Sequence, residues 1–132
     1  MRLSADQLRF VDRVANLTGL DAGVIAVWVG TVSGWGAERA DHNYVGPPGA
    51  SWRDTASAAH AAAATLGPGA RMAAPLGPPQ QIAAIAKSPF NVSEPALLDA
   101  WHLAGREQAT AVAPARSTLW AQFRDRWMQW VL

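Results

Sequence analysis

Apolar and polar residues at positions 5–18 separate onto two faces of a helix. At about 100° per residue, Leu8, Val11 and Val14 fall on one half of the helical wheel, and most charged residues fall on the other. Ser4, followed three residues later by a glutamine, has the signature of a capping box, which predicts that the helix begins here. The pattern is typical of a helix that packs one face on a core.

The next stretch, 22–33, contains no charged residue. A helix that is apolar all round must be buried on most sides, so we place it at the centre of the fold. Gly34 and Gly36 predict its end. Residues 35–53 lack periodicity and are rich in Gly, Pro, Asp and Asn, which predicts a long irregular loop. Its length and its aromatic residues favour an ordered loop that lines a cleft or interface.

After residue 53 the pattern predicts four more helices, and nowhere does the chain show a strand pattern or an internal repeat. The helices are expected at about 55–66, 80–87, 94–108 and 117–132, with one further turn at 70–74. The predicted fold class is therefore all-α.

The last predicted helix is the most sharply amphipathic segment of the chain. Its apolar stripe, within an arc of about 120°, consists of Leu119, Trp120, Phe123, Trp127 and Trp130. Such a stripe can pack on the body of the same chain. Because interfaces are enriched in Trp and Phe, it is also a candidate surface for another subunit. Both interpretations stay open, since the stripe is wide.

Composition and charge reduce the number of functions that the chain could have. At 132 residues the chain suits one domain. Only 16% of the residues are charged, against about 25% in typical soluble domains, so partners are expected to cover some apolar surface. The net charge of +1 comes without a basic run, which argues against nucleic acid as a partner.

Absent residue types and segments reduce it further. The chain has no Cys, which excludes disulfides, thiolate metal sites and a Cys nucleophile. The first residues lack the apolar region of a signal peptide, and no stretch approaches the ~18 apolar residues of a membrane span. We therefore expect a protein made in a cytoplasm without a signal peptide, with no membrane span and no cofactor.

Several short motifs follow one another in a specific order over residues 8–92. They are Phe10-Val11, Thr18–Asp21, Val24–Val29 with Ser33–Trp35, Asn43–Gly46, Ala58–Leu66 and Gln81–Phe90. In this order the chain resembles the lysozyme-like muralytic domains of phage tail proteins and endolysins, which are related in fold to goose-type lysozyme and lytic transglycosylases. The resemblance implies a lysozyme-like helical domain at 1–92. Residues 93–132 would then form an extension of two extra helices, which packs on this domain or on a partner.

In this family the central helix ends in Ala-Trp-Val-x-x-Glu-Ser-Gly, and the Glu is the general acid that protonates the glycosidic oxygen of peptidoglycan. The corresponding stretch here is Trp28–Gly34, and it carries Val32 in place of the Glu. Cleavage of a glycosidic bond needs a carboxylic acid that still holds its proton near neutral pH. Valine has no proton to give, and general acid catalysis typically contributes ~10²–10⁴-fold to the rate. The resemblance thus implies a catalytically inactive domain.

A substitute acid is conceivable in the loop. Glu38 lies three residues beyond Trp35 and could reach the cleft, although a loop rarely reproduces the geometry that a helix end fixes. The solvated turn is the simpler interpretation of Glu38. The neighbouring Asp41 and His42 also suggest metal ligands, but adjacent ligands on an irregular loop are a poor signal, so we expect no metal site.

The resemblance also provides candidate binding residues for a degenerate cleft. These are Ser33, Trp35, Asn43, Tyr44 and Trp52. The aromatic members could form a wall on which sugar rings stack, or they could pin the long loop to the core.

The leading hypothesis is a catalytically inactive lysozyme-like domain that serves as a structural or adaptor component of a phage virion, in the tail or baseplate region. Its partners would be other virion proteins or a second copy of the chain. One alternative is an active peptidoglycan hydrolase or lytic transglycosylase that uses Glu38. The other is a module that binds cell-wall glycan.

Overall fold

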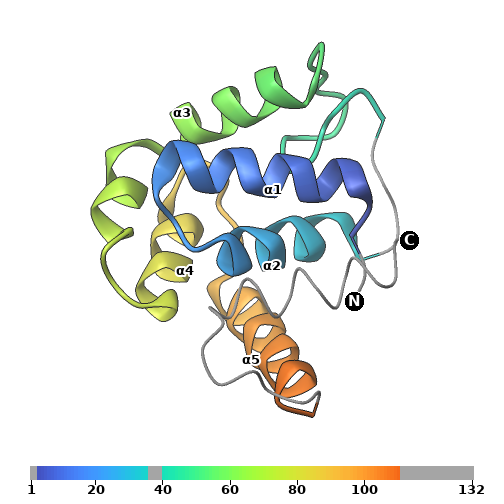
Figure 1. Ribbon diagram of the computed structural model, residues 1–132. Helices are drawn as coiled ribbons and strands as arrows, with labels where there is room; N and C mark the ends of the chain where they lie inside the picture. The colour runs from blue at the N-terminus through green and yellow to red at the C-terminus, as the bar shows by residue number, and fades with distance from the viewer. Residues whose placement is uncertain (1–2, 36–39, 111–132) are drawn as a thin grey trace.

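The computed structural model describes residues 3–35 and 40–110, with the side chains up to Gly105. This part of the chain is all-α and contains no strand, which confirms the predicted fold class (Figure 1). The helices are α1 (Ala5–Thr18), α2 (Ala22–Ser33), α3 (Thr55–Ala73), α4 (Pro78–Lys87) and α5 (Glu94–Thr110). The predicted helix at 117–132 lies outside the described residues.

Local capping explains where α1 and α2 begin and end. The Ser4 hydroxyl accepts from the Gln7 backbone N–H at 3.1 Å, and the Gln7 amide oxygen accepts from the Ser4 N–H at 2.8 Å, which completes the predicted capping box. Gly19 ends α1 with a φ of 78°, a left-handed conformation that costs glycine little. The Asp21 carboxylate then accepts from the Gly23 N–H at 2.7 Å and starts α2.

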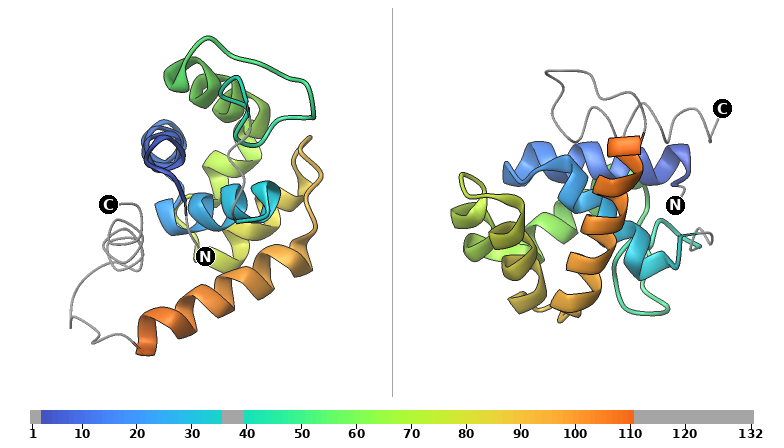
Figure 2. Two further views of the ribbon diagram at one scale, coloured as in Figure 1. Left: turned by 90° about the vertical axis from the view of Figure 1, so that its right-hand side faces the viewer. Right: turned by 90° about the horizontal axis from the view of Figure 1, so that it is seen from below.

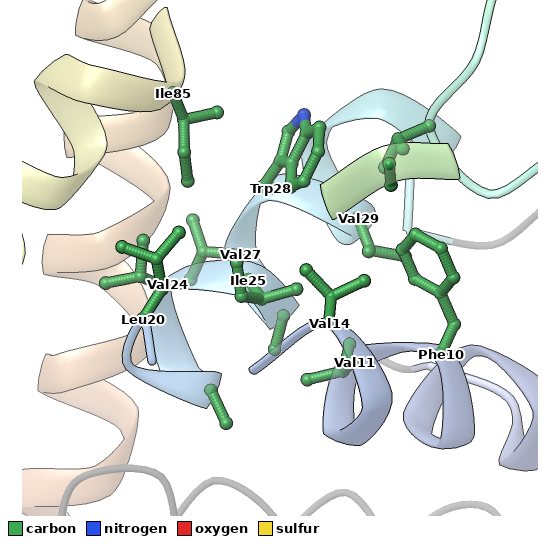
Figure 3. Close-up of a cluster of buried hydrophobic side chains, with 14 of the residues drawn as sticks. Phe10, Val11, Val14, Leu20, Val24, Ile25, Val27, Trp28, Val29 and Ile85 are labelled. Atoms are coloured by element: carbon green, nitrogen blue, oxygen red, sulfur yellow. The ribbon is translucent and has the colours of Figure 1, made fainter. Parts of the chain in front are cut away.

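Helix α2 lies at the centre of the fold, as its lack of charge predicted. Every residue from 22 to 30 is buried, because α1, α4 and α5 all pack against this helix. Figure 3 shows Val29 of α2 beside Phe10 of α1, while Ile85 reaches in from α4. Burial decreases at the last turn, where residues 31–33 are only half-buried.

Helix α3 differs from its prediction at the C-terminal end. It continues to Ala73, and the turn expected at 70–74 largely belongs to its last part. Gly67, with φ 75° and ψ −169°, breaks the helical path, and Pro68 starts the second part (Figure 1). Proline is favoured in the first turn of a helix, where its missing N–H has no partner to lose.

Helix α5 packs on the body of the protein along one side, against α2 and α4 (Figure 2). Its buried residues Leu97, Trp101 and Ala104 recur at helical spacing. The first helix of the 93–132 segment therefore contacts the core directly. None of the helices in the described ranges has the length and apolarity to cross a membrane.

Gln81 of α4 is a buried polar side chain that ties three segments together. Its amide oxygen accepts from the Asp21 N–H at 2.8 Å, at the start of α2. Its amide nitrogen donates to the carbonyls of Ala74 and Leu76, each at 3.0 Å, in the connector that follows α3. The residue is 3% exposed, so no water replaces these bonds easily.

We therefore expect Gln81→Leu, which nearly keeps the side-chain volume, to lower the free energy of unfolding by about 2–4 kcal/mol, because it leaves three partly buried backbone groups without their hydrogen-bond partners. The matched control is Gln80→Leu at the exposed neighbouring position, with an expected change within about 0.5 kcal/mol. Urea unfolding followed by circular dichroism measures both. Equal effects of the two substitutions would contradict the role assigned to Gln81.

Candidate functional site

A cavity of about 160 Å³ lies between the loop before α3, α3 itself and the segment after α4. The loop runs beside α3 before the chain enters that helix (Figures 1 and 2). The described residues that line the cavity are Phe10, His42, Tyr44, Val45, Gly46, Pro47, Trp52, Ala58, Ala61, Ala62, Thr65, Pro89 and Phe90.

One face of α3 forms a wall of this cavity with small side chains. Ala58, Ala61, Ala62 and Thr65 stand at positions i, i+3, i+4 and i+7, which share one face of a helix. Alanine side chains on this face leave space that longer residues would fill. The alanine-rich sequence of α3 therefore contributes directly to the cavity volume.

Aromatic rings form much of the remaining lining. The rings of Phe10 and Tyr44 stack with centroids 4.5 Å apart and an interplanar angle of 20°. The Tyr44 hydroxyl lies 2.9 Å from the hydroxyl of Thr55, in the first turn of α3. The Phe90 ring meets the Trp28 ring edge-on, with centroids 4.8 Å apart. These contacts hold the rings in place, because such aromatic pairs prefer stacked or edge-to-face geometry.

Trp52 connects the end of the loop before α3 with an earlier part of the same loop. Its backbone N–H donates to the Asp41 carbonyl at 2.9 Å, and its backbone carbonyl lies 3.2 Å from Nδ1 of His42. A Cβ on Gly46 would lie 2.5 Å from the Trp52 ring, so the ring packs directly on the backbone at this glycine. The Asn43 amide nitrogen adds a bond to the Pro47 carbonyl at 2.8 Å.

Trp35 lies outside the described cavity lining and packs on the end of α2. The Trp35 backbone N–H donates to the Gly30 carbonyl at 3.0 Å, which is the 6→1 bond of a Schellman motif. The N–H of Gly34 donates to the same carbonyl, which is the 5→1 bond of an αL helix end. A Cβ on Gly30 would lie 2.2 Å from the Trp35 ring, so glycine is required for this contact. Trp35 therefore pins the start of the loop to the helix end, and it does not line the cavity.

Val32 and Ser33 are also absent from the described cavity lining. Val32 is half-buried and packs against the core, while the Ser33 hydroxyl donates to the Gly30 carbonyl at 3.3 Å. Of the five candidate binding residues, the structure thus brings Tyr44 and Trp52 to the cavity. Asn43 is not among the described lining residues, and its hydrogen bond to the Pro47 carbonyl stabilises the loop that carries Tyr44 and Trp52.

Sequence reasoning did not select Phe10, the small face of α3 or Phe90 as site residues. Phe10 lies on the core face of α1, and alanines at helical spacing predict close packing. The i, i+3, i+4, i+7 pattern of small residues was the available signal, but it does not distinguish a packed face from a cavity wall.

Charged groups contribute little to this site. None of the described lining residues is Asp or Glu, and Glu38 lies outside the described residues. Asp54 caps α3, and the hydrogen bond from the Ser57 N–H at 2.7 Å lowers the pKa of its carboxyl. Among the described side chains, which end at Gly105, no three His, Asp or Glu gather where they could hold a metal ion.

The aromatic stripe predicted at 119–130 also lies outside the described residues.

No known protein family, curated protein or solved structure matches the chain. The resemblance to lysozyme-like domains therefore stays a prediction, carried by the order of the motifs between residues 8 and 92.

The contact of Trp35 with Gly30 predicts an unusual response to alanine. In a helix interior, Gly→Ala normally adds up to about 1 kcal/mol of stability. At Gly30 we expect the opposite, a loss of about 1–3 kcal/mol, because the added methyl overlaps the Trp35 ring. Gly105→Ala in α5 is the control, since a Cβ there meets no atom within 4 Å. Thermal unfolding measures both, and stabilisation by Gly30→Ala would contradict the contact.

Proposed function

We propose that this chain is a catalytically inactive lysozyme-like domain that serves as a structural or adaptor component of a phage virion, in the tail or baseplate region. The observation that carries the proposal is Val32 at the position of the family's general acid. The side chain there is half-buried and packs against the core. It offers neither a proton nor a charge to a glycosidic bond.

The composition of the cavity supports the same conclusion. A glycosidase of this kind needs a protonated carboxyl beside the scissile bond, in a partly apolar pocket that raises its pKa. Val32 lies outside the described lining of the cavity, and that lining itself holds no carboxyl, so neither place provides the acid. The role that we propose is therefore the binding of a partner and includes no catalysis.

The adaptor role is supported by the sequence after α5. The stripe at 119–130 combines three Trp residues with Leu and Phe, the composition typical of protein interfaces. The partners we propose are other virion proteins or a second copy of this chain.

A second candidate is a module that binds cell-wall glycan, favoured by Tyr44 and Trp52 in the cavity wall. Aromatic faces commonly provide flat apolar surfaces for ligands. Under this alternative the domain keeps the cleft and has lost the acid.

The catalytic part of the proposal is tested with a turbidity assay on purified cell walls. We expect no clearing by the wild type or by Glu38→Gln. Clearing by Val32→Glu, which reinstates the carboxyl, would add support for the family resemblance. An active lysozyme is the positive control, and circular dichroism confirms that each variant folds. If the wild type clears the cell walls and Glu38→Gln does not, the proposal of an inactive domain is wrong and the hydrolase that uses Glu38 is favoured.

The adaptor part is tested by light scattering on the full chain. We expect an average mass above the 14.0 kDa of one chain at high concentration, or stable binding to a protein of the same particle. Trp127→Ala should weaken this association, because it removes a ring from the stripe. Gln129→Ala, off the stripe, is the control. A monomer at high concentration that also finds no partner in the particle would contradict the proposal.

A further inference from the structure

We infer that the cavity binds one apolar ring, supplied by an aromatic side chain of a partner protein. The first argument is size. A volume of about 160 Å³ is close to the ~150 Å³ of an apolar protein cavity that accepts benzene, and it is well below the ~300–1,000 Å³ of typical small-molecule sites. The cavity accommodates one ring, and a sugar chain exceeds it.

The second argument is the polarity of the lining. Nine of the thirteen described lining residues have no polar side-chain atom. Three of the four others have a hydrogen-bond partner: Tyr44 pairs with Thr55, Thr65 donates to the Ala61 carbonyl at 2.9 Å, and His42 pairs with the Trp52 carbonyl. The fourth is Trp52, whose indole carries a single N–H. A sugar carries several hydroxyl groups, and each costs free energy when it is buried without a partner. An apolar ring carries no such cost.

The third argument is that the walls are fixed before anything binds. The stacked Phe10 and Tyr44 rings form one wall, and Trp28 supports Phe90 from behind. Trp52 is seated on Gly46, where even a methyl group would overlap it. Preformed walls lower the entropy cost of binding, because few side chains must be ordered.

The source of the ring is a protein partner. The cavity is partly open, and Pro47 and Pro89 of its lining are exposed to solvent, so a side chain projecting from another surface can enter. Aromatic residues in pockets are the usual anchors of protein interfaces. This assignment to a partner protein rests on the proposed adaptor function, whereas the preference for an apolar ring rests on the cavity alone.

The inference is tested by titrating the full chain with three probes and recording amide NMR shifts and melting temperature. The probes are indole, N-acetyltryptophanamide as a side chain on a peptide backbone, and the disaccharide of N-acetylglucosamine. We expect the first two to shift amides around the cavity and, near saturation, to raise the melting temperature by about 2–5 °C. The disaccharide should do neither.

Ala61→Leu provides the test of location, because it extends a side chain from the cavity wall. We expect it to weaken indole binding at least tenfold. Ala64→Leu, exposed on the same helix and outside the described lining, should leave the affinity within twofold. If Ala61→Leu fails to fold, Ala58→Val is the smaller substitution at the same wall.

Indole binding that is lost in Ala61→Leu and kept in Ala64→Leu supports the site. Binding of the disaccharide at the cavity, or indole binding unaffected by Ala61→Leu, overturns it. Binding of indole without N-acetyltryptophanamide overturns the partner protein as the source of the ring. The turbidity assay separates the two proposals: lysis abolished by Glu38→Gln overturns the inactive domain, whereas absent ring binding without lysis overturns only this inference.

Discussion

The burial of α2 on nearly all sides determines how the other helices are arranged. A helix whose residues from 22 to 30 carry no charge and few polar atoms is stable in water only when other elements cover it. Helices α1, α4 and α5 provide that cover, so their positions follow from the one helix. Gln81 reinforces the arrangement by tying α4 to the start of α2.

Two glycine–tryptophan contacts organise the region where α2 leaves the core. Trp35 packs on Gly30 and Trp52 packs on Gly46, and in each case a single methyl group would overlap the indole ring. The first contact fixes the helix end, and the second fixes the loop over the cavity. Large rings on bare backbone give the loop rigid attachment points, which explains how a segment without periodicity can form one wall of a cavity.

The proposed function depends on two separate places in this region, the end of α2 and the cavity. Val32, the residue that the proposed resemblance places at the position of the acid, packs against the core, while the aromatic cavity lies between the loop and α3. Under the proposed function, no acid stands at this position and the domain has no catalytic need to admit a sugar. An apolar cavity with most of its polar groups already paired suits recognition of another protein.

The all-α class, the ends of α1 and α2 and the central place of α2 could be predicted from the amino-acid sequence, because caps and hydrophobic period act within about four residues of each position. The residues of the cavity became known only from the folded chain. It separated Trp35 from Tyr44 and Trp52, and it joined Phe10 and Phe90 to the face of α3. A cavity is the volume left between side chains distant in the chain, so no local pattern specifies it.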